Sequence, residues 1–403
     1  MKSKSIVSIL CICLVLSAVL SFIATPSYAA APAEWTVAFY IDSDNDLDSW
    51  AQKDVQELMA IGSTRDVNVV LYWDTSTGPG HMYKVGKNSL VELTRFEYDR
   101  VEPNMGDPKT LRSFVSFVFK EFQAKKYALV LWDHGDDFRG LMFDYHIPDA
   151  GFDLLSNQEI VDALSGFRIN TLMYAACVMS QIDVAYEYAV NGLDVDYLVA
   201  TEGYDTMDSF PFDWVLSSLT SHPGLTPLEF SKMAVDEYID YYTGVGNAYS
   251  QAATMSVLQI NTADELGDSM LRLGDCLRAD IGTYAPIISN ARGQANMPWS
   301  QNGWDRLVDL KVFAQSIRDQ STDPAVVNAA ETVLGAIPQT VLYVQCLKAM
   351  DKHGVNGIGI YFPTSRGSFE NNKTLYGVSY NVMAFARAGW LEFLSAYWGT
   401  SAK

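Results

Sequence analysis

Residues 127–135 read YALVLWDHG, an apolar run that stops abruptly at Asp133, His134 and Gly135. Runs that are apolar at nearly every position are typical of strands buried on both faces of a parallel sheet. We therefore predict a strand here and four more of the same kind in the first half of the chain. These four are residues 35–41 (WTVAFYI), 68–73 (NVVLYW), 171–175 (TLMYA) and 197–200 (YLVA).

The segments between these strands show the apolar spacing of helices. Strands that alternate with helices form a mostly parallel sheet with right-handed crossovers and helices on both faces, so the fold class is α/β. A hairpin is expected around residues 82–93. The predicted helices are residues 48–61, 107–122, 157–164 and about 179–190.

The second half of the chain is more helical. No proline-rich linker, charge block or repeat separates the halves. We expect residues 30–225 to form an α/β domain and residues 226–403 to form a C-terminal α/β region packed against it. In that region we predict helices at residues 227–242, 262–280, 304–318, 325–336 and about 382–397, with strands at 340–346 and 357–362.

The N-terminus has the pattern of an export signal. Lys2 and Lys4 precede an apolar stretch over residues 6–24, and Ser27-Tyr28-Ala29 is a small-x-small site for a signal peptidase. We expect residues 1–29 to be a signal peptide cleaved after Ala29, which predicts a secreted or extracytoplasmic protein. An uncleaved membrane anchor is the alternative, since the run is long enough to cross a bilayer.

The mature protein is predicted to be strongly acidic and to have an odd number of cysteines. Loss of the two lysines takes the formal charge from −20 to −22, which argues against nucleic acid or an anionic membrane as partner. The cysteines left are Cys177, Cys276 and Cys346, so at least one thiol is unpaired. Cys276 and Cys346 form either a disulfide or two separate thiols.

Two reactive residues follow two of the predicted strands. His134 and Cys177 each lie two residues past a strand, and the carboxyl ends of parallel strands meet at one edge of a sheet. A cysteine that opens a helix has a lowered thiol pKa, and an imidazole can accept its proton. The N–H groups of Gly135 and Cys177 are candidates for an oxyanion hole. This pattern predicts acyl transfer.

Taken alone, these residues leave a structural interpretation open. A cysteine among apolar residues is often simply packed in a core, and a histidine after a strand is often structural. Their coincidence at one sheet edge, together with an unpaired thiol, makes the two interpretations about equally plausible.

Several motifs resemble those of the clostripain family of cysteine peptidases, relatives of the caspases. Residues 129–135 (LVLWDHG) are similar to that family's histidine motif, and residues 175–179 (AACVM), with 185–187 (AYE), are similar to its cysteine motif. The resemblance implies a caspase-like sheet, with His134 as general base and Cys177 as nucleophile. The further matches, in family order, are residues 200–202 (ATE), 308–310 (VDL), 313–314 (FA) and 357–363 (GIGIYFP).

The resemblance also assigns a substrate pocket, in which this sequence departs from the family. Members that cleave after Arg or Lys have an acid two residues before the cysteine, where this chain has Ala175. Glu202, Asp205 and Asp208 are the other pocket candidates, and the two aspartates are either a carboxylate for a basic substrate or an ordinary solvated loop. We expect no strict Arg or Lys specificity.

Three acidic residues surround the histidine motif. Asp136 and Asp137 follow Gly135, and we interpret them as an exposed acidic turn. The side chain of Asp133 is expected to point away from His134. Between the two motifs only Arg139 and Arg168 are basic, so we expect no activating cleavage of the family kind.

No metal site is predicted. His81, His146, His222 and His353 lack metal-ligand spacing. Residues 42–46 (DSDND) resemble the start of a calcium loop, but the sixth-position glycine and the closing glutamate are missing, which indicates a solvated turn. No cofactor is expected, although the resemblance leaves calcium as an option because the family includes calcium-dependent members.

The function predicted from the sequence is a secreted cysteine endopeptidase that hydrolyses peptide bonds in protein or peptide substrates through Cys177 and His134. The alternative is a catalytically inactive family member that acts as a secreted binding or surface protein. The sequence does not indicate an oligomeric state.

Overall fold

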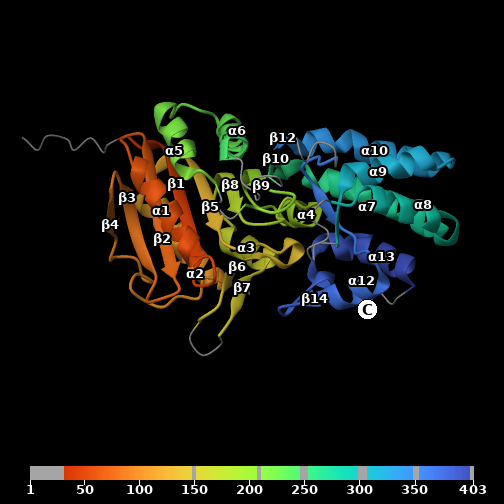
Figure 1. Cartoon of the computed structure of the whole chain (residues 1–403), viewed down its shortest axis with the longest axis horizontal. Helices are drawn as coiled ribbons and strands as arrows, with labels where there is room; N and C mark the ends of the chain where they lie inside the picture. Colours follow the sequence, from red (N-terminus) through yellow and green to blue (C-terminus); the bar gives the residue numbers. More distant parts are fainter. Residues whose placement is uncertain are drawn as a thin grey trace, which may run out of the picture. The chain divides into compact units, whose positions relative to one another are not determined.

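Five parallel strands form the centre of the structure (Figure 1). The computed structural model describes residues 31–147, 151–206, 210–245, 253–297, 306–347 and 354–399, which belong to one compact unit from Pro32 onward. The order of the central strands in the sheet is β9-β8-β5-β1-β2. They are β1 (Ala33–Ser43), β2 (Val67–Thr75), β5 (Ala124–Trp132), β8 (Ile169–Ala175) and β9 (Val195–Ala200). All five correspond to predicted strands.

Antiparallel strands extend the sheet at both edges. On one side β3 (His81–Gly86) and β4 (Ser89–Glu92) form the expected hairpin, and on the other β10 (Thr254–Gln259) and β12 (Val341–Cys346) continue beyond β9. The described residues thus form a nine-stranded, mostly parallel sheet. The sequence did not predict β10. The strand predicted at 357–362 corresponds to β13 (Gly359–Tyr361), which is shorter. It does not join the nine-stranded sheet but pairs with β11 (Leu307–Asp309) in a separate two-stranded ladder.

Side chains of the central strands alternate between two buried clusters. In β1, Phe39 and Ile41 face one cluster while Ala38 and Tyr40 face the other, as the period of two in a strand requires. Because helices cover both faces, each of these strands has an apolar run at its centre. The first face is covered by α1 (Asp48–Ile61), α5 (Phe212–Ser221) and α6 (Pro227–Val245).

The second face has a thicker helical layer. It includes α2 (Pro108–Glu121), α3 (Asn157–Leu164), α4 (Ile182–Val190) and α7 (Ala263–Ala279). The C-terminal part adds α8 (Ile281–Gln294), α9 (Leu310–Gln320), α10 (Pro324–Thr340), α12 (Arg366–Asn372) and α13 (Leu391–Trp398). Short ladders join β6 (Leu141–Asp144) to β7 (Asp153–Leu155) and β14 (Thr374–Leu375) to β15 (Val378–Ser379).

Two predicted helix boundaries are wrong for local reasons. The helix expected at 304–318 begins as α9 at Leu310, because β11 precedes it and the Asp309 carboxylate caps it by accepting from Val312 N. The helix expected from Met179 begins at Ile182. Cys177 therefore lies in a turn and does not open a helix.

The residues beyond 225 are largely helical, and they pack against the sheet. They also supply β10 and β12 to that sheet, with Val257 of β10 paired with Val199 of β9. The boundary at residue 225 remains a prediction. Residues 1–29 lie outside the described residues, so the signal peptide is likewise still a prediction. Among the helices that are described, none combines the length and apolar character needed to span a membrane.

Candidate active site

The strand β5 delivers His134 to the carboxyl edge of the sheet. Trp132, its last residue, is in register with Ala175 at the end of β8. The pairing continues one residue further, because Asp133 N donates to Ala175 O over 3.2 Å. The two loops that follow these strands therefore start side by side, as the sequence predicted.

The loop after β8 holds Cys177 in a constrained turn. Val178 has a φ of +53°, a region that β-branched residues rarely adopt. Val178 N donates to Gly203 O over 2.6 Å, and Ser180 N donates to Thr201 O over 2.9 Å. The segment that follows β9 thus holds this turn in place, and strained backbone of this kind clusters at functional sites.

His134 and Cys177 line the same cavity, which encloses about 70 Å³. The glycine beside His134 explains how closely the two loops approach. A Cβ atom on Gly135 would lie 2.4 Å from the carbonyl oxygen of Cys177 and 3.0 Å from Cβ of Ala176, so only glycine fits. The other lining residues are Leu47, Trp132, Asp133, Ala175, Ala176, Asp205 and Thr206.

The histidine contacts Asp46, an acidic residue that the sequence analysis did not connect with it. His134 Nε2 lies 3.0 Å from Asp46 Oδ1, and the imidazole side chain is 32% exposed. Its ring is nearly parallel to that of Tyr145, with centroids 6.5 Å apart. Asp133 points away, as predicted, because its carboxylate accepts from Asn45 Nδ2 over 2.8 Å and from Phe143 N.

The electrostatic environment of Cys177 differs from the one predicted. Burial, and secondarily the charge of Asp205, raises the pKa of the Cys177 thiol to about 12. The expected lowering by a helix dipole is absent because that effect fades within the first turn, and α4 starts five residues later at Ile182. A thiol with this pKa is protonated at neutral pH, and Cys177 Sγ donates to Asp205 O over 3.8 Å.

Two of the four predicted pocket residues line the cavity. Ala175 and Asp205 do so, whereas Asp208 lies outside the described residues. Glu202 is not among the lining residues. It is fully buried and accepts from Gly357 N over 2.8 Å, so its carboxyl group joins two backbone segments away from the cavity.

Asp205 is partly buried, and its carboxylate is hydrogen-bonded within the protein. Its carboxylate accepts hydrogen bonds from Tyr238 Oη over 2.8 Å and from Thr206 N over 2.9 Å. Burial raises the pKa of Asp205 to about 7, although both hydrogen bonds lower it. The sequence could not indicate this, because Tyr238 lies on α6 and is distant in the chain.

The exposed acidic turn predicted after Gly135 is also wrong. Asp136 and Asp137 are 7% and 1% exposed, and both pair with arginines. Arg139 Nη1 lies 3.0 Å from Asp136, and Arg306 Nε lies 2.6 Å from Asp137 and also contacts Asp136. Arg306 is distant in the chain from Asp136 and Asp137, so the sequence alone could not identify it as their partner.

The solvated turn predicted at residues 42–46 is buried for most of its length. Asp42, Ser43, Asp44 and Asn45 are at most 6% exposed, and only Asp46 reaches solvent. Cys276, in turn, is a free thiol on α7, so it forms no disulfide with Cys346.

A mostly parallel sheet with a cysteine and a histidine at one cavity on its carboxyl edge defines an α/β protein of the cysteine-peptidase class. The sequence model of the clostripain family matches residues 39–398, and the chain belongs to that family of cysteine peptidases. Clostripain from Hathewaya histolytica is 25% identical over 226 residues, which are 47% of this chain and 43% of clostripain. The match thus spans less than half of that relative.

Two solved structures have a similar fold. A secreted C11 cysteine protease from Bacteroides thetaiotaomicron, in complex with an irreversible peptide inhibitor, has a TM-score of 0.64 at 18% identity, covering 88% of this chain and 99% of that one. An inactive zymogen C11 protease from Parabacteroides distasonis has a TM-score of 0.63 at 17% identity, covering 89% and 98%. At these identities the likeness concerns the fold.

Proposed function

We propose that this chain is a secreted cysteine endopeptidase in which Cys177 is the nucleophile and His134 the general base. The observation that carries the proposal is the cavity that both residues line at the carboxyl ends of β5 and β8. The signal pattern at residues 1–29 and the similarity to a protease described as secreted support export. Proteins or peptides are the proposed substrates.

The neutral thiol defines the order of proton transfer. With a pKa of about 12, Cys177 gives up its proton only as it attacks, so His134 accepts that proton while sulfur bonds to the peptide carbonyl carbon. His134 then returns the proton to the leaving amine as the C–N bond breaks. Water, activated by the same imidazole, hydrolyses the thioester and restores the thiol.

The N–H groups of Gly135 and Cys177 are the proposed oxyanion hole. Gly135 has no side chain between its backbone and the Cys177 turn, and a Cβ there would lie 2.4 Å from Cys177 O. A carbonyl attacked by the thiol would therefore meet the backbone of both residues. Preorganised N–H donors of this kind stabilise the tetrahedral oxyanion.

Asp205 is the acidic residue that we propose for the primary pocket. Ala175 leaves its wall apolar, whereas Asp205 contributes a carboxyl group that is only partly ionised near neutral pH, because its pKa is about 7. A lysine or arginine side chain would gain less there than beside a fully ionised acid. We therefore propose that specificity for basic residues is not strict.

The raised thiol pKa and the small cavity also favour a second candidate, a catalytically inactive binding or surface protein. Such a protein would keep the family fold without acyl transfer.

Iodoacetamide labelling followed by mass spectrometry separates the two. In the active enzyme Cys177 is alkylated faster than Cys276, which serves as an internal control, and His134→Ala slows Cys177 alone. Peptide cleavage should fall by about 10²–10⁴-fold in His134→Ala and vanish in Cys177→Ala. If Cys177 reacts no faster than Cys276 and no peptide in a library is cut, the protein is not a peptidase.

A further inference from the structure

A row of aromatic side chains extends outward from His134. The centroid of the imidazole ring lies 6.0 Å from that of Phe143 and 6.5 Å from that of Tyr145. The ring of Phe152 is 5.9 Å from Phe143 and 6.0 Å from Tyr145. Tyr376 ends the row, since its ring is 5.5 Å from both Phe143 and Phe152. These separations are within the range of favourable ring contacts, and we call Phe143, Tyr145, Phe152 and Tyr376 the aromatic shelf.

The aromatic shelf is open to solvent. Tyr145 is 38% exposed and Tyr376 is 53% exposed, while Phe152 is partly buried and Phe143 forms the buried base. Three aromatic side chains are exposed among the described residues, and these two tyrosines lie in one cluster beside His134. Clustered apolar groups on the surface of a protein mark sites of interaction. The shelf therefore has the character of a binding surface.

The backbone at Tyr376 is an independent sign of function. Tyr376 and Gly377 connect β14 to β15, and their φ angles are +53° and +81°. Positive φ at both central residues is required by a type I′ turn, whose first position favours Asn, Asp or Gly. A bulky side chain in this conformation is an outlier, and such strained residues cluster at ligand-binding sites. Asparagine would suit the turn better, so the tyrosine ring itself is the feature that needs an explanation.

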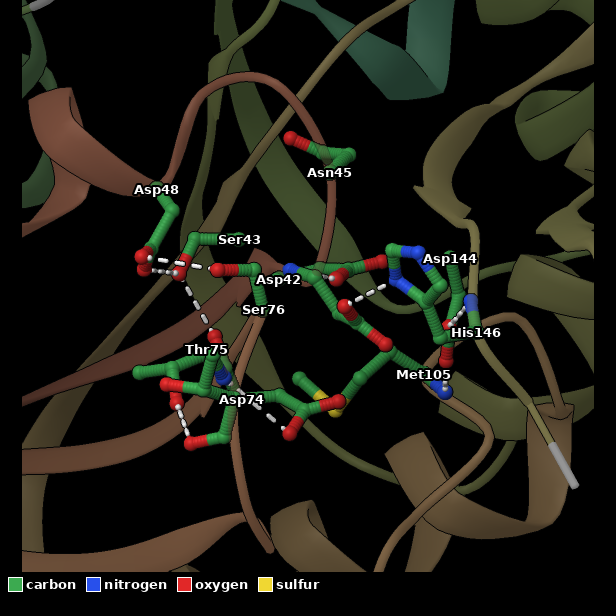
Figure 2. A network of polar contacts seen from close by, with 12 residues as sticks. Asp42, Ser43, Asn45, Asp48, Asp74, Thr75, Ser76, Met105, Asp144 and His146 are labelled. Carbon is green, nitrogen blue, oxygen red and sulfur yellow. Dashed lines mark hydrogen bonds and ion pairs between the residues drawn. The ribbon is translucent and has the colours of Figure 1, made fainter.

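Tyr145 is held firmly in place directly after β6. Its backbone N–H donates to Asp44 O over 3.0 Å. On one side of it, Asp144 accepts from Met105 N over 2.9 Å, and on the other, His146 Nδ1 lies 2.5 Å from Asp44 Oδ1. Figure 2 shows Asp144 and His146 within this polar network. The ring of Tyr145 thus projects from a fixed backbone, which lowers the entropic cost of binding to it.

The role proposed for His134 decides which part of a substrate meets the aromatic shelf, so this inference rests on the proposed function. His134 returns a proton to the leaving amine, and that nitrogen must lie within hydrogen-bond reach of the imidazole. The substrate residues P1′ and P2′ begin at this nitrogen. The acyl part, bonded to Cys177, lies instead at the cavity, whose lining includes no member of the shelf. The shelf is therefore on the leaving-group side of the proposed reaction.

The dimensions of the aromatic shelf suit the first two residues of the leaving segment. An extended chain advances roughly 3.3–3.6 Å per residue, so two residues span about 7 Å. The nearest shelf rings, those of Phe143 and Tyr145, lie 6.0 and 6.5 Å from the ring of His134. We propose that the aromatic shelf is a substrate subsite that binds a large apolar side chain, preferably an aromatic one, at P1′ or P2′ of the peptide.

Apolar side chains fit this subsite better than basic ones. A large side chain on the aromatic shelf is stabilised in proportion to the apolar area that it buries, and an aromatic one adds edge-to-face contacts. A cation over an exposed ring gains comparatively little. Asp46 could attract a basic residue, but its carboxylate already contacts His134.

Peptides that differ in one leaving-side residue test the subsite. In a peptide that the enzyme cuts, P1′ and P2′ are replaced in turn by phenylalanine, leucine, lysine or glycine, and cleavage of the mixture is followed by mass spectrometry. For the wild type we expect kcat/KM to be about tenfold higher with phenylalanine than with glycine at one of the two positions. Leucine should be intermediate, and lysine should be no better than glycine.

Variants of Tyr376 locate the subsite. Tyr376→Asn removes the ring and introduces a residue that tolerates a positive φ, so the turn should keep its conformation. The ratio of phenylalanine to glycine should fall to about threefold or less, whereas Tyr376→Phe, which keeps the ring, should retain the wild-type ratio. Trp214→Ala is the matched control and should leave the ratio unchanged, because Trp214 is an exposed aromatic residue on α5 outside the aromatic shelf.

A methyl ester separates the subsite from the proposed function. The methyl ester of the acyl part of the same peptide has no leaving-side residue, so its hydrolysis reports the chemistry alone. If the wild type hydrolyses the ester and the glycine peptide but shows no preference for phenylalanine, or prefers lysine, the subsite is refuted and the proposed function stands. A wild-type ratio in Tyr376→Asn would also refute the subsite. If neither the ester nor any peptide is hydrolysed, the proposed function fails, and the subsite fails with it.

Discussion

At the residue scale, the character of the site depends on two partly buried residues, Cys177 and Asp205, that are linked through the backbone of Asp205. The Cys177 thiol donates to the backbone of Asp205, and the carboxylate charge of Asp205 is one cause of the raised thiol pKa. A basic substrate side chain beside Asp205 would offset that charge. It would therefore favour ionisation of the thiol as well as binding.

The ionisation of Asp205 predicts a pH-dependent preference for basic substrates. Because its pKa is raised to about 7, the carboxyl group is mostly neutral at pH 6 and mostly ionised at pH 8. The ratio of kcat/KM for a P1-arginine peptide to that for a P1-leucine peptide should therefore rise by about tenfold over this range. Protonation of His134 affects both peptides and cancels in the ratio.

The control is Asp205→Asn, which keeps the shape of the side chain and removes the charge. Its ratio should be low and independent of pH. A ratio in the unmodified enzyme that is already flat from pH 6 to pH 8 would show that Asp205 does not contact the P1 side chain.

At the element scale, the loop after β5 is held by a residue from the second half of the chain. Arg306 lies just before β11 and pairs with Asp136 and Asp137, directly after the His134–Gly135 segment. This arrangement couples the C-terminal region to the loop that carries His134. A charge pair of this kind is costly to break, since removing one partner leaves the other buried.

We therefore expect Arg306→Ala to be strongly destabilising. It leaves two buried aspartates with Arg139 as their remaining cationic partner in the described network, and the expected loss is about 3–5 kcal/mol in the free energy of unfolding. Urea denaturation followed by tryptophan fluorescence measures this.

Arg318→Ala is the matched control, because Arg318 is a partly exposed arginine that pairs with Asp319 on the surface of α9. Its expected cost is about 0–1 kcal/mol. Similar losses in the two variants would show that the buried network contributes little to stability.

At the scale of the whole molecule, one sheet contains strands from both halves of the chain. Strands β10 and β12 come from beyond residue 225, and Met255 and Val257 pack in the same buried cluster as Phe39. On the other face Leu266 and Met270 of α7 share a core with the strands. Separating the halves would expose apolar surface on both faces.

This continuity predicts that a fragment ending at residue 225 does not fold alone. Loss of β10 would leave β9 as a sheet edge, and loss of α6 and α7 would uncover apolar side chains on both faces. The fragment 30–225 should be aggregated or lack a cooperative unfolding transition, as judged by size-exclusion chromatography and circular dichroism. A monodisperse fragment with a cooperative transition would support an independent catalytic domain.

Much of the architecture could be predicted because its signals are local. The central strands are continuous apolar runs, and parallel strands bring their carboxyl ends to one edge, so His134 and Cys177 were expected to meet. Strand β10 was missed because Thr254, Ser256 and Gln259 interrupt its apolar character. Its identity as a strand depends on pairing with β9 and β12.

The sequence by itself determined the sheet, the family and the pair of residues at its edge, since periodicity and motif spacing are encoded in neighbouring residues. Only the tertiary structure decided the electrostatics. Whether Asp44, Asp137 or Asp205 is solvated depends on partners such as Arg306 and Tyr238 that are distant in the chain. Charge and burial depend on which residues lie nearby in three dimensions, so an aspartate in a polar turn can be exposed to solvent, hydrogen-bonded at a cavity or part of a buried ion pair.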